Sequence, residues 1–141
     1  MAEGRFRRFL ARSLERLAVE APGHYRALAS AVAPRQVVLR VDDEVVGLVF
    51  AAASVVVAPA LRPAVELRTD RTTLLALVRG GHLLEAILDD RLCLRGAPAD
   101  LVAFEAGLRC YLHGAVRAPS LPPLLDAYRE GVPLPKELDH G

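Results

Sequence analysis

Residues 65–96 read VELRTDRTTLLALVRGGHLLEAILDDRLCLRG, and this stretch contains the signals that decide the fold. At its start, residues 64–69 alternate apolar and polar side chains, which is typical of a half-buried strand. Asp70 is then a suitable N-cap, and a leucine-rich segment continues to Gly80, where a glycine pair can adopt the left-handed conformation that ends a helix. We therefore predict a strand at 64–69 followed by a helix at 71–79.

The second half of the same stretch predicts a short helix and another strand. Residues 82–88 contain three leucines and one isoleucine, and residues 91–95 read RLCLR, which places two leucines on one face. Beyond this strand, Pro98 suits the first turn of a helix. Apolar residues at helical spacing continue that helix to about residue 115.

Upstream, residues 37–41, 45–50 and 54–58 predict three further strands. The last two lie in an uncharged run of 17 residues, from Val45 to Leu61, which reaches the lower limit of a membrane span. The run is rich in valine, and branching at Cβ favours strands over helices. We therefore interpret it as a strand, a turn of small residues and a second strand, not as a membrane helix.

The N-terminal segment predicts an amphipathic helix over residues 6–17, followed by a short helix at 24–32. Apolar residues at helical spacing form one side of the first helix. Four arginines lie on the opposite side: Arg5, Arg8, Arg12 and Arg16. This basic face has two interpretations, a side of the helix that is simply solvated or a docking surface for an anionic membrane.

Length and composition exclude several classes of protein. The chain has 141 residues, enough for one domain, and 52% of them are hydrophobic, which argues against disorder. The net charge is only +1, aromatic residues make up 5%, and tryptophan is absent, so we expect no nucleic-acid partner. The two cysteines cannot form a disulfide framework and no secretory signal is recognisable, so we expect a cytoplasmic protein.

The polar residues form no recognisable catalytic or metal-binding motif. None of the four histidines has metal-ligand spacing to another, and the sequence contains neither a nucleophile elbow nor a glycine-rich phosphate loop. We therefore predict that the protein is not an enzyme and has no catalytic residues, metal or cofactor. A small enzyme that uses His82, His113 or Tyr111 as an acid or base is the remaining alternative.

The elements follow one another in the order of an α+β domain. This order resembles the sterol carrier protein-2 domain family over residues 37–112, and most specifically over 65–96. The family's positions are occupied by Asp70, Leu74, Leu75, Gly80, Ala86, Arg91, Leu92, Leu94 and Gly96. The chain departs from the family in two turns, since it has two aspartates at 89–90 where a glycine is usual, and Gly-Ala-Pro at 96–98 where Gly-Asp is usual.

The resemblance implies a five-stranded mixed sheet covered by helices on one face, with an apolar tunnel between the layers. Family members carry lipids, serve as accessory modules of lipid-handling enzymes, or look like assembly factors of isoprenoid quinone synthesis. We accordingly divide the chain into an N-terminal helical segment (1–34) that packs on the domain, a lipid-binding core (35–118), and a proline-rich C-terminal segment with a short helix (119–141).

The predicted function is to bind and carry a sterol, fatty acyl or prenyl lipid. The alternative is an accessory or scaffold subunit of a lipid- or quinone-synthesis complex, whose apolar helices form a homodimer or an interface with a partner enzyme. Burial of a lipid chain is favourable by about 0.8 kcal/mol per methylene and needs no charged anchor. The candidate tunnel-lining residues, each of which would also suit an ordinary core, are Phe50, Val56, Leu74, Leu77, Val78, Leu84, Ile87, Leu88, Phe104, Leu108 and Leu112.

Overall fold

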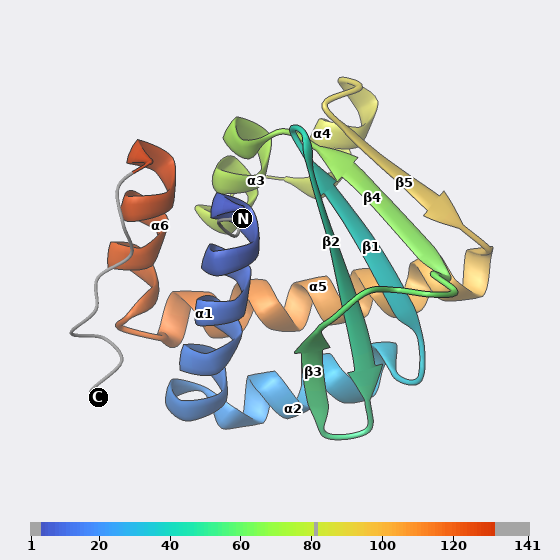
Figure 1. Cartoon of the computed structure of the whole chain (residues 1–141), viewed down its shortest axis with the longest axis horizontal. Helices are drawn as coiled ribbons and strands as arrows, with labels where there is room; N and C mark the ends of the chain where they lie inside the picture. The colour runs from blue at the N-terminus through green and yellow to red at the C-terminus, as the bar shows by residue number, and fades with distance from the viewer. Residues whose placement is uncertain (1–3, 81, 132–141) are drawn as a thin grey trace.

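The computed structural model describes residues 4–80 and 82–131 (Figure 1). Its elements are α1 (Arg5–Glu20), α2 (Pro22–Val32), β1 (Gln36–Val41), β2 (Glu44–Ala51), β3 (Ser54–Val57), β4 (Val65–Thr69), α3 (Arg71–Val78), α4 (Leu83–Leu88), β5 (Leu92–Gly96), α5 (Pro98–Arg117) and α6 (Leu121–Glu130). The valine-rich run at 45–61 includes β3 and all of β2 except its first residue, Glu44, so its interpretation as two strands is confirmed. Among the described residues, none of the helices combines the length and apolarity that a membrane crossing requires.

The five strands form one mixed sheet in the order β3-β2-β1-β4-β5. Neighbouring strands are antiparallel except for β1 and β4, which are parallel. The chain therefore has to pass across the sheet between β3 and β4, and residues 58–64 do so on the face away from α2 and α5 (Figure 1). The main-chain N–H of Ala58 donates to the carbonyl of Gly47 at 3.0 Å, and a Cβ on residue 47 would collide with this connection. Only a glycine fits beneath the crossing.

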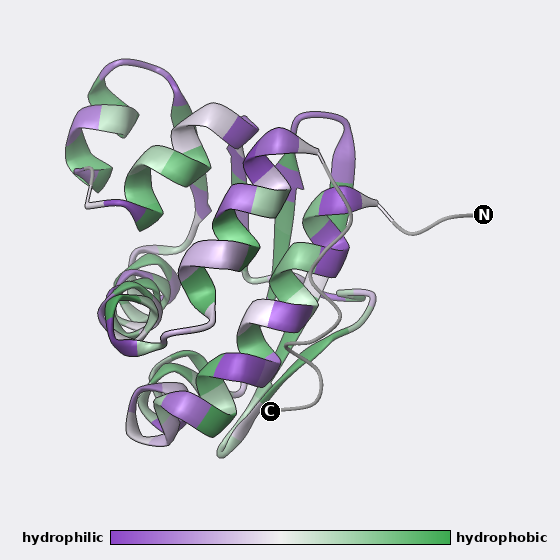
Figure 2. Ribbon diagram, turned by 90° about the vertical axis from the view of Figure 1, so that its left-hand side faces the viewer, coloured by the Kyte–Doolittle hydropathy of each residue, from purple (hydrophilic) through white to green (hydrophobic). Residues whose placement is uncertain are grey.

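The helices cover the other face of the sheet. Alternate residues of β1 and β2 are buried, and all of these inward positions are apolar: Val37, Leu39, Val41, Val46, Leu48 and Phe50. In Figure 1, α2 and α5 cross behind the sheet, and α5 approaches α2 so closely that a Cβ on Gly107 would collide with Val32. Hydrophobic and hydrophilic residues alternate along the helices in Figure 2, as expected when one side of each helix is covered. The predicted five-stranded mixed sheet with helices on one face is confirmed.

The last helix, α6, begins three residues earlier than the sequence pattern predicts. The predicted helix spans 124–129 and leaves Pro122 and Pro123 in a stiff linker, but both prolines lie in the first turn of α6. Proline is tolerated there because the first N–H groups of a helix have no partner within it. Residues 132–141, which belong to the predicted C-terminal segment, lie outside the described residues, and the division into three segments stays a prediction.

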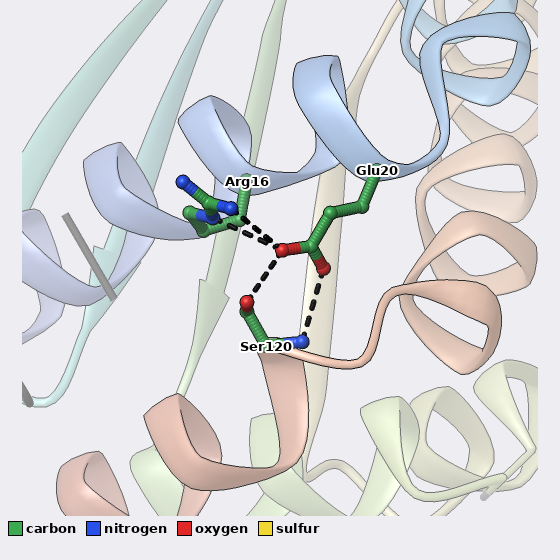
Figure 3. Close-up of polar contacts among 3 residues, drawn as sticks. All are labelled: Arg16, Glu20 and Ser120. Carbon is green, nitrogen blue, oxygen red and sulfur yellow. Dashed lines mark hydrogen bonds and ion pairs between the residues drawn. The ribbon is translucent and has the colours of Figure 1, made fainter. Parts of the chain in front are cut away.

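Glu20, the last residue of α1, fastens the start of α6 (Figure 3). Its carboxylate accepts hydrogen bonds from the main-chain N–H of Ser120 at 3.0 Å, from the Ser120 hydroxyl, and from the Arg16 guanidinium at 2.8 Å. Burial alone would raise the pKa of Glu20, but the hydrogen bonds from Ser120 and the ion pair with Arg16 outweigh burial and lower this pKa. The charged carboxylate is therefore the form that holds α1 and α6 together.

We expect Glu20→Gln to lower the free energy of unfolding at neutral pH by about 1–3 kcal/mol, because charge-assisted hydrogen bonds are replaced by weaker ones. The pKa of Glu20 is lower in the folded chain than in the unfolded chain. Its stabilising effect is therefore complete above the ordinary carboxyl pKa and is lost as the pH falls through the folded-state pKa.

Urea denaturation at a series of decreasing pH values measures this effect. The difference in stability between the wild type and Glu20→Gln should shrink on the acid side. Glu15→Gln is the matched control, because it removes an exposed carboxylate from the same helix. A difference that stays constant with pH would contradict the assignment.

Candidate functional site

An apolar cavity of about 80 Å³, the core cavity, lies between the inner face of the sheet and the helices. Strands β1 to β4 contribute to one wall, and α1, α2, α3 and α5 contribute to the other. The lining residues are Phe6, Phe9, Leu10, Leu14, Leu28, Val32, Leu39, Val41, Leu48, Phe50, Val55, Leu67, Leu74, Val78, Phe104, Leu108 and Tyr111.

The periodicities of the strands and helices bring these side chains together. On the strands, the lining residues are the inward members of the two-residue alternation, such as Leu39 and Leu48. On the helices, they recur every three or four residues, as Leu74 and Val78 do on α3, because such residues share one face. The cavity lies where these apolar faces meet without filling the space between them.

The only side-chain polar atom among the lining residues is the hydroxyl of Tyr111, and it is fully engaged. It donates to the Ser13 hydroxyl at 2.8 Å, and Ser13 in turn donates to the carbonyl of Leu10 at 2.9 Å. Burial raises the pKa of Tyr111 to about 12, and the hydrogen bond to Ser13 offsets only part of that rise. The hydroxyl is therefore protonated at neutral pH, and the cavity presents no charge to a molecule inside it. It is suited to an apolar group.

The core cavity comes nearest to solvent between α3 and α5. Its lining residues are buried except for Leu74 on α3 and Leu108 on α5, which are only partly buried. We therefore expect an apolar group to enter the core cavity beside these two leucines.

Five of the eleven residues predicted to line a tunnel border the core cavity, namely Phe50, Leu74, Val78, Phe104 and Leu108. The sequence analysis missed the large contribution of α1 and α2, which includes Phe6, Phe9 and Leu28. The signal was present in the apolar stripe of α1. That stripe shows that these side chains face the core, but not that they border a void.

The other six predicted residues lie outside the core cavity: Val56, Leu77, Leu84, Ile87, Leu88 and Leu112. Leu77 is buried and Leu112 is partly buried. Val56 is 51% exposed because it points away from the helices on β3. The three residues of α4 are far from the centre because this six-residue helix packs beside the edge strand β5.

The four arginines predicted to dock on a membrane lie on α1, but three of them are engaged within the protein. Arg5 donates to a main-chain carbonyl of α6 at 3.1 Å. Arg12 and Arg16 form ion pairs with glutamates of α1 itself at 3.4 and 2.8 Å. Arg8 is exposed. Two of the four arginines are thus paired with carboxylates of the same helix, and a third is hydrogen-bonded to a carbonyl.

The candidate acids and bases are not gathered at one place. His82 precedes α4 and His113 lies near the end of α5, and both are exposed, whereas Tyr111 is buried. In the part of the chain that the structure describes, no group of three or more histidine, cysteine, aspartate or glutamate residues could hold a metal ion.

No protein-family model matches the chain, and neither does any curated protein. Solved structures are similar to it, among them the following two. One is a conserved hypothetical protein from Thermus thermophilus, described as a possible sterol carrier protein; it is 16% identical, the match covers 77% of this chain and 87% of that one, and the TM-score is 0.52. The fold is sterol carrier protein-2-like.

The second structure is described as "UbiJ-SCP2 Ubiquinone synthesis protein". It is 14% identical, the match covers 69% of this chain and 96% of that one, and the TM-score is 0.49. At these identities the similarity is one of architecture. The Thermus thermophilus structure confirms the resemblance that residues 65–96 predict, as a sterol carrier protein-2-like fold.

Proposed function

We propose that the protein is a non-catalytic lipid-binding protein or carrier, which takes the apolar part of a sterol-like, acyl or prenyl molecule into the core cavity. The observation that carries this proposal is the cavity itself, since its walls are apolar and its one hydroxyl is already bonded to Ser13. Each methylene transferred from water into such a space contributes about 0.8 kcal/mol. A sterol carrier protein-2-like fold, in which helices cover one sheet face, supports the same function.

The volume of the cavity implies that binding is coupled to movement. A cavity of roughly 150 Å³ is the size that accepts a benzene molecule, and the core cavity is about half of that. A lipid chain therefore has to push the covering helices apart. An empty apolar cavity of 80 Å³ costs about 2 kcal/mol at ~24 cal/mol per Å³, and filling it offsets part of the cost of that movement.

The first test is whether the protein retains or takes up lipid. Native mass spectrometry of the purified protein, followed by solvent extraction, should detect bound lipid, and fluorescent fatty acid or sterol probes should bind. Leu108→Trp should reduce probe binding at least tenfold, because a larger side chain at the rim of the cavity occupies the space between α3 and α5.

The matched control is Leu112→Trp, which enlarges a partly buried leucine of the same helix that does not line the cavity. Circular dichroism and thermal melting verify that both variants are folded. Absence of retained lipid together with absence of probe uptake by the wild-type protein would overturn the lipid-binding proposal.

Docking on an anionic membrane is a secondary part of this proposal. Arg8 is exposed on α1, whereas Arg5, Arg12 and Arg16 already have acceptors within the protein. We therefore expect only weak binding to vesicles that contain anionic lipid, decreasing as salt is added. Sedimentation with vesicles at two salt concentrations measures it, and binding that does not respond to salt would remove the arginines from the docking step.

The second candidate is an accessory or scaffold subunit of a lipid- or quinone-synthesis complex. Its support is an apolar surface where α4, β5 and the first half of α5 meet, with Leu84, Leu88 and Val102 exposed by 66%, 72% and 69%. A hollow of about 390 Å³ lies in this surface. Exposed apolar patches of this kind mark interfaces.

If this surface pairs two copies of the chain, size-exclusion chromatography with light scattering should give a dimer, and Leu84→Glu should return it to a monomer. A wild-type monomer at high protein concentration would exclude the homodimer. Binding to a partner enzyme would then be the remaining form of this alternative.

A further inference from the structure

A second hollow of about 210 Å³, the outer hollow, lies at the surface between α3, α5 and α6. It shares one residue with the core cavity, because Val78 lines both. Val78 is the last residue of α3 and is buried. A single valine side chain therefore borders both spaces.

The two spaces together have the size of a small-molecule site. Ligand pockets usually have volumes of about 300 Å³ or more. Neither space reaches this alone, but volumes of about 80 and 210 Å³ approach it once they are joined at Val78. Val78, at the end of α3, is the residue that the linings of the two spaces share.

The chemistry of the two spaces differs in a way that matches an amphiphile. The core cavity is lined by apolar side chains, whereas Arg79 and Asp126 lie among the residues of the outer hollow. Arg79 directly follows Val78 in the chain. It forms an ion pair with Asp126 of α6 at 2.9 Å, and both side chains are about half exposed. A molecule that spans both spaces would therefore have an apolar tail inside and a polar head near Arg79.

Arg79 can exchange its partner at little cost. Asp126 also lies 3.6 Å from the guanidinium of Arg129, one turn further along α6. If another anion binds the Arg79 guanidinium, Asp126 still has the Arg129 guanidinium beside it. The planar guanidinium of Arg79 can form paired hydrogen bonds with a carboxylate or a phosphate.

We propose that the core cavity and the outer hollow are two compartments of one site for a single-chain amphiphile with an anionic head group. The tail lies in the core cavity, Val78 separates the compartments, and Arg79 binds the carboxylate or phosphate. This assignment rests on the proposed lipid-binding function and adds the class of the lipid and the residue that selects it. It also gives the polar head a place outside the uncharged core.

Isothermal titration with decanoate, decyl phosphate and 1-decanol tests the head-group site, because the three probes share a ten-carbon chain. Arg79→Gln should weaken binding of the preferred anionic probe about tenfold and leave 1-decanol within about twofold of the wild type. Asp126→Asn should strengthen binding of the same anionic probe, since it removes the competing carboxylate. Arg109→Gln is the control, because Arg109 is also an exposed arginine paired with a carboxylate.

Substitutions of Val78 test whether this residue separates the two compartments. Val78→Ala should strengthen binding of all three probes, because it widens the connection between the compartments, and Val78→Phe should weaken binding of all three. Val102→Phe, at an exposed position of α5, is the control. Circular dichroism and melting temperature verify that the variants are folded. If Val78→Phe does not fold, Val78→Ala still tests the assignment.

The outcomes separate the two proposals. If all probes bind and Arg79→Gln changes none of them, the head-group assignment is wrong and the lipid-binding function stands. If no probe binds to the wild type or to Val78→Ala, the assignment is overturned, and the lipid-binding function is overturned with it if the purified protein also retains no lipid and takes up no fatty acid or sterol probe. Preference for decanoate or for decyl phosphate identifies the head group as carboxylate or phosphate.

Discussion

The inward side of the sheet is apolar along its central strands, and this apolar surface is removed from water by the helices that cover it. This constraint governs the arrangement of the molecule. α1, α2 and α5 present their apolar stripes to Val37, Leu39 and the other inward residues, while residues 58–64 cross the opposite face. Four helix faces and a twisted sheet do not match perfectly in shape, and the mismatch is concentrated in the core cavity. The void is thus a consequence of how the layers meet, at a position that no single element determines.

The interior tolerates this void because its polar atoms are satisfied elsewhere. The Tyr111 hydroxyl is bonded to Ser13, and no buried side-chain nitrogen or oxygen among the described residues lacks a partner. An unsatisfied polar atom would draw water into the cavity and make it a poor site for an apolar group. With that atom bonded, the cavity can stay dry, and its cost is limited to lost van der Waals contact. Binding of an apolar chain would restore those contacts, which links the packing defect to the proposed function.

The elements could be predicted closely because their signals are local. Alternation predicted β4, valine-rich runs predicted β1 to β3, and apolar residues at helical spacing predicted α3 and α5. Asp70 accepts a hydrogen bond from the N–H of Thr73, as an N-cap should. The site was only half accessible to the same reasoning. Leu74 and Leu108 were predicted because helix periodicity assigns them an inward face, but α4 has apolar residues on several faces and its position beside β5 depends on the sheet order. The share of α1 in the cavity also depends on tertiary packing, which no local pattern contains.

The arginines of α1 illustrate how a sequence pattern can have a structural cause. Their four-residue spacing has the form of a basic surface, yet two of them are engaged in holding α6 in place. Arg16 supports the Glu20 carboxylate that receives Ser120, and Arg5 reaches the carbonyl of Tyr128 near the other end of α6. Arg79 adds a contact between these two ends. Charged groups thus contact α6 near its start, middle and end, and they hold this helix against α1 and α3. The same set of contacts fixes the helix over the core, and it includes the ion pair between Arg79 and Asp126 on which the proposed head-group site depends.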